Sequence, residues 1–269
     1  MASNGTWLFS SGGFEEFFGW KITRGVPYVN VGVVCAAKHP RNGKSDLRIM
    51  GFDVREVQLG DAVASVVFHI TMAYTDSTLK TWSFSTGSPD SWMLVAQGLY
   101  LTSCLSSVHI LKPALAEGMT LMTSTDGHLA LWSRDPADTS ELRWTARHQV
   151  HQNAILSTAL YTLPDSSVLL ITGGDDDALV FTRITSPQSA SATSKTLTIP
   201  RAHAAAITGV LCRSTAGQGV QEVVTLGLDQ TVEVWEVRLR NEAEVWMDWK
   251  YRGRGRGGRV LLTLGICFG

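Results

Sequence analysis

Three consecutive aspartates, Asp175 to Asp177, form the most conspicuous polar cluster in the chain. Carboxylate oxygens are good ligands for a hard cation such as Ca²⁺, but such a site needs them at alternate positions around a sharp glycine turn. Here the aspartates follow the β-type run Val168–Ile171 and a pair of glycines, where a hairpin turn is expected. The pattern therefore predicts a turn, and we expect no metal site.

Other combinations of reactive side chains are sparse. His148 and His151 are three residues apart, a spacing that suits metal ligation on a helix, but their segment leads into a predicted strand. The chain lacks the phosphate-binding motif G-x-x-x-x-G-K-[ST], the serine-nucleophile motif G-x-S-x-G and the zinc motif H-E-x-x-H. The sequence therefore predicts a non-enzyme with no catalytic residue, no cofactor and no small-molecule substrate.

A repeat organises the middle of the chain. The segments MAYTDSTLKTW, MTSTDGHLALW, TGGDDDALVFT and TLGLDQTVEVW align without gaps. Their last residues are Trp82, Trp132, Thr182 and Trp235. Each has an aspartate six residues earlier, and these are Asp76, Asp126, Asp176 and Asp229. The aspartates are 50, 50 and 53 residues apart, and a fixed offset at a nearly constant period indicates a structural repeat.

Each segment is typical of a β-hairpin. A short β-type run leads into a turn, and alternation such as that of Val232–Trp235 marks a strand with one buried face. The turn aspartate can bond its own backbone two residues later. Strand-like stretches such as Ile155–Leu163 and Ala206–Leu211 precede two hairpins. The expected fold class is therefore all-β, an incomplete β-propeller of about four to five blades with four antiparallel strands each.

Three regions are expected along the chain. Residues 1–24 are interpreted as an irregular N-terminal segment and residues 25–239 as the repeat region. Asp46–Val54 is typical of the outer strand of an earlier repeat, to which Val29–Ala37 is also assigned. Residues 240–269 form an atypical tail rich in arginine and glycine, interpreted either as a disordered or artefactual end or as a cationic arm.

The repeat resembles the WD-repeat family. In that family a histidine that opens the blade, a hydroxyl residue, a turn aspartate and a strand tryptophan form a hydrogen-bonded network. The last segment matches this pattern at His203, Thr225, Asp229 and Trp235. The third segment matches it at His151, Thr172 and Asp176, with Thr182 in place of the aromatic residue. The first two keep the aspartate and the tryptophan but have Met72 and Met122 at the hydroxyl position.

The stretch Ala202–Trp235 is more specifically similar to a family of WD-repeat proteins that form the non-catalytic subunit of a tRNA ribose 2′-O-methyltransferase. This resemblance implies a scaffold that partners an FtsJ-type methyltransferase acting on the tRNA wobble nucleotide, with the catalytic residues in the partner. Members of that family are longer, so we expect a C-terminal fragment or a truncated product. The WD pattern alone leaves open an adaptor for ubiquitin ligation or vesicle traffic, with no RNA role.

Composition limits the remaining possibilities. A net charge of −1 gives no overall attraction to nucleic acid, so RNA or partner binding would need a local basic patch. The candidates on blade loops are Arg143, Arg147 and Arg201. No secretory signal or apolar stretch of about 20 residues is found, so we expect a cytoplasmic protein without membrane insertion. The four cysteines are scattered and are expected to be buried free thiols.

Overall fold

The structure is a computed structural model of the chain. It describes residues 2–3, 7–12, 14–24, 31–40, 46–57, 65–101, 103–111, 119–135, 137–185, 193–214, 220–239 and 247–256. These residues form twenty strands and no helix. Within this described part, no helix therefore exists that could cross a membrane.

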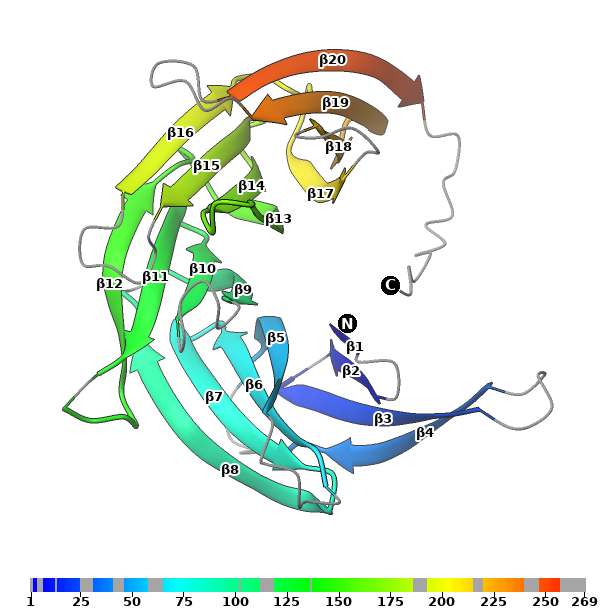
Figure 1. The fold of residues 1–269 in the computed structure, drawn as a ribbon, viewed down its shortest axis with the longest axis vertical. Helices are drawn as coiled ribbons and strands as arrows, with labels where there is room; N and C mark the ends of the chain where they lie inside the picture. The colour runs from blue at the N-terminus through cyan, green and yellow to red at the C-terminus, as the bar shows by residue number, and fades with distance from the viewer. Residues whose placement is uncertain are drawn as a thin grey trace. The chain divides into compact units, whose positions relative to one another are not determined.

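The strands form five four-stranded sheets, in each of which strands consecutive in the chain are neighbours (Figure 1). The first sheet contains β1 (Ala2–Ser3), β2 (Trp7–Gly12), β3 (Glu16–Arg24) and β4 (Val31–Lys38). The second contains β5 (Ile49–Val57), β6 (Val67–Tyr74), β7 (Thr78–Ser85) and β8 (Ser88–Leu99). The third contains β9 (Leu105–Ile110), β10 (Thr120–Ser124), β11 (His128–Arg134) and β12 (Leu142–Gln149).

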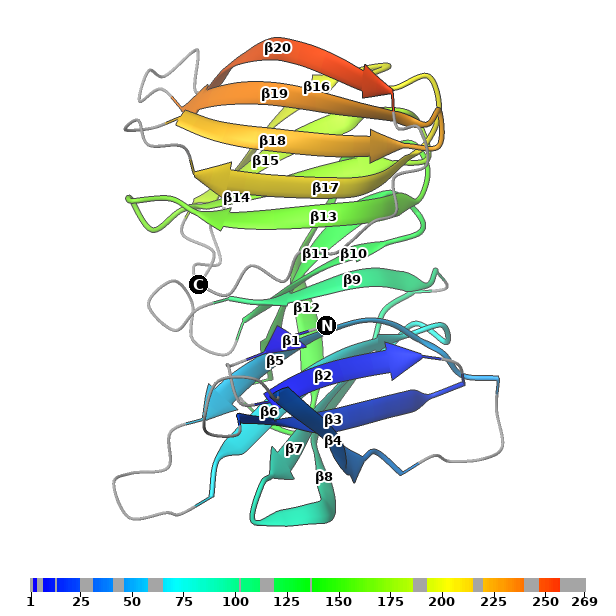
Figure 2. The same ribbon diagram turned by 90° about the vertical axis from the view of Figure 1, so that its right-hand side faces the viewer.

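The fourth sheet contains β13 (Ile155–Thr162), β14 (Val168–Gly174), β15 (Leu179–Thr185) and β16 (Thr193–Ile199). The fifth contains β17 (Ile207–Ser214), β18 (Val220–Gly227), β19 (Thr231–Leu239) and β20 (Met247–Arg256), which lie side by side in Figure 2. Backbone contacts divide the chain into one compact unit of Met1–Ile110, Trp132–Trp144 and Ile266–Gly269 and a second of Leu111–Leu131 and Thr145–Gly265. The expected all-β fold of repeated four-stranded sheets is confirmed.

The four predicted hairpins all form, and their turns share one backbone geometry. The residue after each turn aspartate has a positive φ: 68° at Ser77, 79° at Gly127, 62° at Asp177 and 63° at Gln230. The aspartate Oδ1 accepts a hydrogen bond from the N–H two residues later, at Thr78, His128, Ala178 and Thr231. This bond holds the left-handed residue in place, which explains why the turn aspartate recurs.

Residues 1–24 were expected to be irregular, and this prediction is wrong for the described residues, which form β1, β2 and β3. Trp7, Phe9 and Phe17 are buried, and they pack with Phe68 and Phe84 of the second sheet in an aromatic core. The first sheet lacks the turn aspartate that the other four hairpins share, so a search for that aspartate misses its strands. Burial of these aromatic side chains, each removing about 150–250 Å² from water, stabilises the first sheet.

The segments Val29–Ala37 and Asp46–Val54 were assigned to one repeat, and the structure places them in two different sheets. β4 is the last strand of the first sheet, and β5 is the first strand of the second. β5 pairs with β6 over Ile49–Val57, so it begins the second sheet rather than ending the first. Within each sheet, strands that are consecutive in the chain pair with each other. β4 therefore pairs with the preceding strand β3, whereas β5 pairs with the following strand β6.

Residues Met247–Arg256 of the tail form strand β20. β20 pairs antiparallel with β19 from Met247 to Arg256, opposite Leu239 to Thr231. The rest of the tail, including Arg259 and Cys267, lies outside the described residues.

The cysteines match the prediction only in part. Within the described part of the chain, Cys35, Cys104 and Cys212 form no disulfide. Cys104 and Cys212 are half-buried, and burial raises the pKa of the Cys212 thiol to about 11. Cys35 was expected to be buried but is exposed, because it lies on the edge strand β4.

Candidate functional site

The fifth sheet contains the complete polar network that the sequence predicted. His203 precedes β17, and its Nε2 lies 2.7 Å from Thr225 Oγ1 on β18. The Trp235 indole N–H donates to the same Oγ1 over 3.0 Å. On the other side of the ring, His203 Nδ1 lies 3.2 Å from Asp229 Oδ1. The network thus joins the connection before β17 to the β18–β19 turn.

The donors in this network follow from its geometry. Because the Asp229 carboxylate can only accept, we assign the ring hydrogen of His203 to Nδ1. Nε2 then accepts from the Thr225 hydroxyl, whose oxygen accepts from the Trp235 indole N–H. Asp229 Oδ2 also accepts from the Ala204 N–H at 2.9 Å. Each buried polar atom in the chain of bonds therefore has a partner, which is what a buried network requires.

The fourth sheet repeats this arrangement with one change. His151 Nδ1 lies 2.7 Å from Asp176 Oδ1, and His151 Nε2 lies 2.8 Å from Thr172 Oγ1. Thr182 stands where the fifth sheet has Trp235, so no indole reaches Thr172. The Thr182 hydroxyl is fully buried and has no hydrogen-bond partner among the described residues. A buried hydroxyl without a partner weakens the fold at this point.

A glycine two residues before the aspartate makes room for each histidine. A Cβ on Gly174 or Gly227 would overlap the imidazole Nδ1 of His151 or His203. The sequence analysis missed these glycines, although their shared offset from Asp176 and Asp229 is a readable signal.

The third sheet replaces the histidine by an arginine. Arg147 on β12 donates to Asp126 Oδ2 over 2.9 Å and lies 3.2 Å from His128 Nδ1. The position of the glycine is taken by Ser124, whose hydroxyl donates to Asp126 Oδ1. With Met122 at the hydroxyl position, the buried Trp132 indole N–H has no partner among the described residues.

The second sheet replaces the network by an aromatic cluster. Tyr74 stands at the glycine position and is completely buried, and its hydroxyl accepts a hydrogen bond from the Trp82 indole over 3.3 Å and donates to Met72 Sδ over 3.2 Å. His39, which follows β4, packs edge-on against Trp82 and Trp92, at centroid distances of 4.4 and 5.0 Å. Neither ring nitrogen of His39 has a hydrogen-bond partner among the described residues.

The networks hold the turn aspartates in their charged form. Burial alone would raise the pKa of Asp229, but the bonds from Thr231, the Ala204 N–H and His203 hold that pKa well below its usual range. The pKa of Asp176 is lowered in the same way, with burial opposed by the Gln152 N–H and His151.

At Asp126 burial is likewise opposed, here by bonds from Ser124 and Arg147, and the pKa falls to about 2. The aspartates therefore remain anionic hydrogen-bond acceptors at neutral pH.

The side chains of these networks bond to one another and stabilise the fold. His151 and His203 have both ring nitrogens engaged, and their side chains are fully buried, so neither can reach a substrate. A catalytic histidine needs a nucleophile and a reacting atom within reach. No group of three or more metal-ligating side chains converges within the part of the chain that the structure describes.

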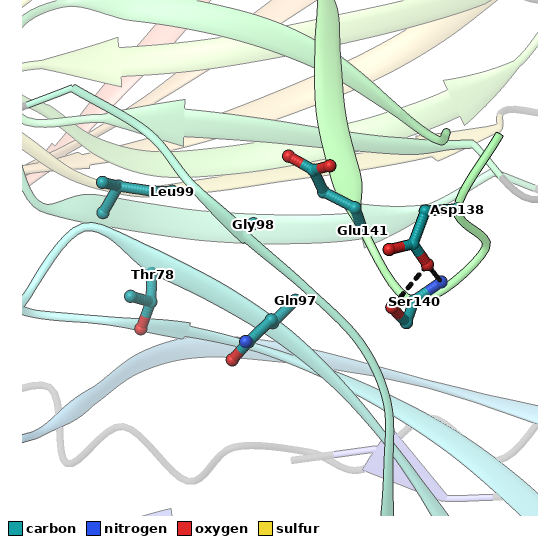
Figure 3. A pocket seen from close by; sticks show the side chains of 7 residues that line it. All are labelled: Thr78, Gln97, Gly98, Leu99, Asp138, Ser140 and Glu141. Carbon is teal, nitrogen blue, oxygen red and sulfur yellow. Dashed lines mark hydrogen bonds between the residues drawn. The ribbon is translucent and has the colours of Figure 1, made fainter. Parts of the chain in front are cut away.

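A pocket of about 460 Å³ lies in the first compact unit. It is lined by Thr78, Gln97, Gly98, Leu99, Asp138, Ser140 and Glu141. Figure 3 shows that the Glu141 carboxylate and the Gln97 amide point away from each other. Asp138 Oδ1 accepts hydrogen bonds from the N–H and hydroxyl of Ser140 at 2.9 and 2.6 Å. The lining groups do not converge on a point where a reacting atom could be held.

The three candidate binding arginines lie in different environments. Arg143 lies 2.9 Å from both Asp135 and Glu141, so two carboxylates offset its charge. Arg147 is occupied by Asp126, as described above. Arg201 is exposed beside His203, with a φ of 51°, and the structure records no ion pair for it among the described residues. Arg143 belongs to the first compact unit, and Arg147 and Arg201 belong to the second.

Comparison with known proteins adds no relative. The chain matches no protein-family model, and no curated protein is significantly similar to it.

Proposed function

We propose that this chain is a non-catalytic WD-repeat scaffold that partners an FtsJ-type methyltransferase in 2′-O-methylation of the tRNA wobble nucleotide. The supporting observation is the complete His203–Asp229–Thr225–Trp235 network, because it forms within Ala202–Trp235, the stretch that carries the resemblance. In this proposal the five sheets are blades of a β-propeller, and the role is cytoplasmic.

The positions of the reactive side chains indicate which protein would supply the catalytic groups. Both blade histidines are held inside structural networks, so the methyl donor and the groups that activate the ribose belong to the partner. The scaffold contributes orientation: it holds the tRNA so that the target hydroxyl enters the partner's site. Fixing two reactants in the reactive geometry can account for about 7–11 kcal/mol of a reaction barrier.

Among the candidate arginines, Arg201 is the residue that we assign to phosphate contact. Arg143 and Arg147 already hold carboxylates, and moving them to a phosphate would leave Asp135 or Asp126 without its cation. Arg201 is exposed and precedes a buried histidine by two residues, so its backbone is anchored while its side chain is accessible.

The test is affinity purification of the full-length gene product, with mass spectrometry of bound proteins and sequencing of bound RNA. An FtsJ-type methyltransferase and tRNA in the same eluate support the proposal. Recovery of neither would contradict it. A variant with Arg201→Glu is expected to keep the methyltransferase and lose tRNA, whereas the control variant Lys21→Glu, at an exposed basic residue of β3, would keep both.

A second candidate is a WD-repeat adaptor for protein complexes, such as those of ubiquitin ligation or vesicle traffic. The neutralised Arg143 and Arg147 favour it, together with the exposed Asp175 on the β14–β15 turn, because these features reduce attraction to phosphate. This candidate predicts protein partners whose recovery is unchanged by ribonuclease treatment.

A further inference from the structure

The edge strand β4 differs from the other strands that end the sheets. It reads VGVVCAAK, and its only charged residue is Lys38 at the end. The corresponding strands of the other sheets each have at least one charged residue inside the strand rather than at its last position: Asp90 on β8, Arg143 and Arg147 on β12, Lys195 on β16, and Asp248 and Lys250 on β20. Charged residues on edge strands are a common protection against pairing with another chain. β4 lacks this protection.

The middle of β4 is open to solvent on both faces. Val33 and Val34 keep 51% and 59% of their surface exposed, and Cys35 is also exposed. Because successive side chains of a strand point to opposite faces, three consecutive exposed residues mean that neither face is covered. One edge of this stretch pairs with Trp20, Lys21 and Ile22 of β3, and no other described strand pairs with the opposite edge.

An unpaired strand edge offers a row of backbone N–H and C=O groups, so the complementary occupant is an extended strand. The exposed valines require that strand to be apolar on both faces. β4 is itself such a strand.

Charge is also compatible with self-pairing. In an antiparallel pair centred on Val34, the two copies of Lys38 lie at opposite ends, about 26 Å apart at 3.3 Å per residue. This separation is well beyond the distance of about 8 Å over which salt screens charges at physiological ionic strength. No like charges therefore face each other along the apolar part of the pair.

We propose that β4 pairs with β4 of a second copy of this chain, which makes the protein a symmetric dimer through edge-to-edge strand addition. Such a twofold contact uses the same surface on both copies, so the assembly ends at two chains. It occupies the apolar edge and leaves the polar networks of the fourth and fifth sheets untouched.

The test is sedimentation equilibrium of the full chain as wild type and as Val34→Lys, with Thr196→Lys as matched control. Thr196 is also exposed on an edge strand, β16, beside Lys195. We expect a wild-type dimer, unchanged in the Thr196→Lys control. Because Val34→Lys places two lysines close together at the centre of the pair, its dissociation constant should rise about tenfold or more.

Val33→Lys probes the opposite face and should weaken the dimer in the same way. Hydrogen exchange provides a second readout, since amides of Val33–Cys35 should gain protection as the wild-type concentration rises. A wild type that stays monomeric at its highest soluble concentration would overturn the proposal. It would also fall if both lysine variants dimerised as tightly as the wild type.

Discussion

Gly227 lies directly against the imidazole of His203, and a Cβ at this glycine would overlap the ring at Nδ1. The same relationship holds between Gly174 and His151. In the third sheet, where Arg147 replaces the histidine, the position carries Ser124, and in the second it carries Tyr74. The residue two before the turn aspartate therefore reports whether a histidine occupies the network.

Replacing this glycine should damage the network. Gly227→Ala pushes the new methyl group into His203 and Asp229, so we expect a loss of about 1–3 kcal/mol in unfolding free energy. Gly12→Ala is the control, because nothing lies within 4 Å of a Cβ there. Chemical denaturation of both variants measures the difference. Equal stability of the two variants would contradict the close contact at Gly227.

Replacing Thr172 and Thr182, two buried threonines on adjacent strands, by valine should change the free energy of unfolding in different directions. Thr172→Val leaves His151 Nε2 without a partner, so the protein should lose about 1–3 kcal/mol. Thr182→Val removes a buried hydroxyl that has no partner among the described residues, so the effect should lie between zero and a gain of about 1 kcal/mol. Thermal unfolding of the pair is the measurement. A larger loss for Thr182→Val than for Thr172→Val would refute this assignment.

Acid should destabilise the protein through the turn aspartates. The pKa of Asp229 is lower in the folded chain than in the unfolded chain, so its contribution is complete above the unfolded pKa of about 3.9 and is lost as pH falls toward the folded value. Asp229→Asn should flatten the stability curve below about pH 4. Urea unfolding at a series of pH values checks this, with exposed Asp175→Asn as control. A curve for Asp229→Asn parallel to the wild type would contradict it.

His39 should produce a second decline at milder pH. Burial, with a smaller contribution from Lys80, lowers its pKa from 6.5 to about 4. The unfolded chain therefore binds a proton below about pH 6.5 that the folded chain resists until about pH 4, and stability falls between these values.

We expect His39→Phe to keep the contacts with Trp82 and Trp92 and to remove about 1–2 kcal/mol of the stability lost between pH 8 and pH 5. Unfolding of both proteins at the two pH values measures this difference. A pH dependence equal to that of the wild type would show that His39 is already solvated.

The sequence predicted the features that depend on neighbouring residues. Asp176 and Asp229 bond the backbone two residues later, so their turns form from local chemistry and could be read directly. The network of His203 was expected from the resemblance to WD repeats, which assigns the histidine, the threonine, the aspartate and the tryptophan to one hydrogen-bonded network. The aromatic packing of Trp7 and Phe9 was missed, since it depends on residues of another sheet.

The role of Arg147 was missed for a similar reason. Its partner Asp126 is 21 residues earlier, and only the pairing within the third sheet brings the two side chains together. The sequence suggested a free cation at this position, whereas the fold uses the charge to hold a turn. Exposure and pairing of a single charged residue depend on the tertiary structure, which hydrophobic periodicity does not determine.

The most direct test of the proposed scaffold role is reconstitution of methyl transfer. The FtsJ-type enzyme is assayed with substrate tRNA in the absence and presence of the full-length gene product, and 2′-O-methylation of the wobble nucleotide is measured by mass spectrometry. The account predicts little methylation by the enzyme alone, strong methylation with the scaffold, and none by the scaffold alone. Equal methylation with and without the scaffold, or methylation by the scaffold alone, would contradict it.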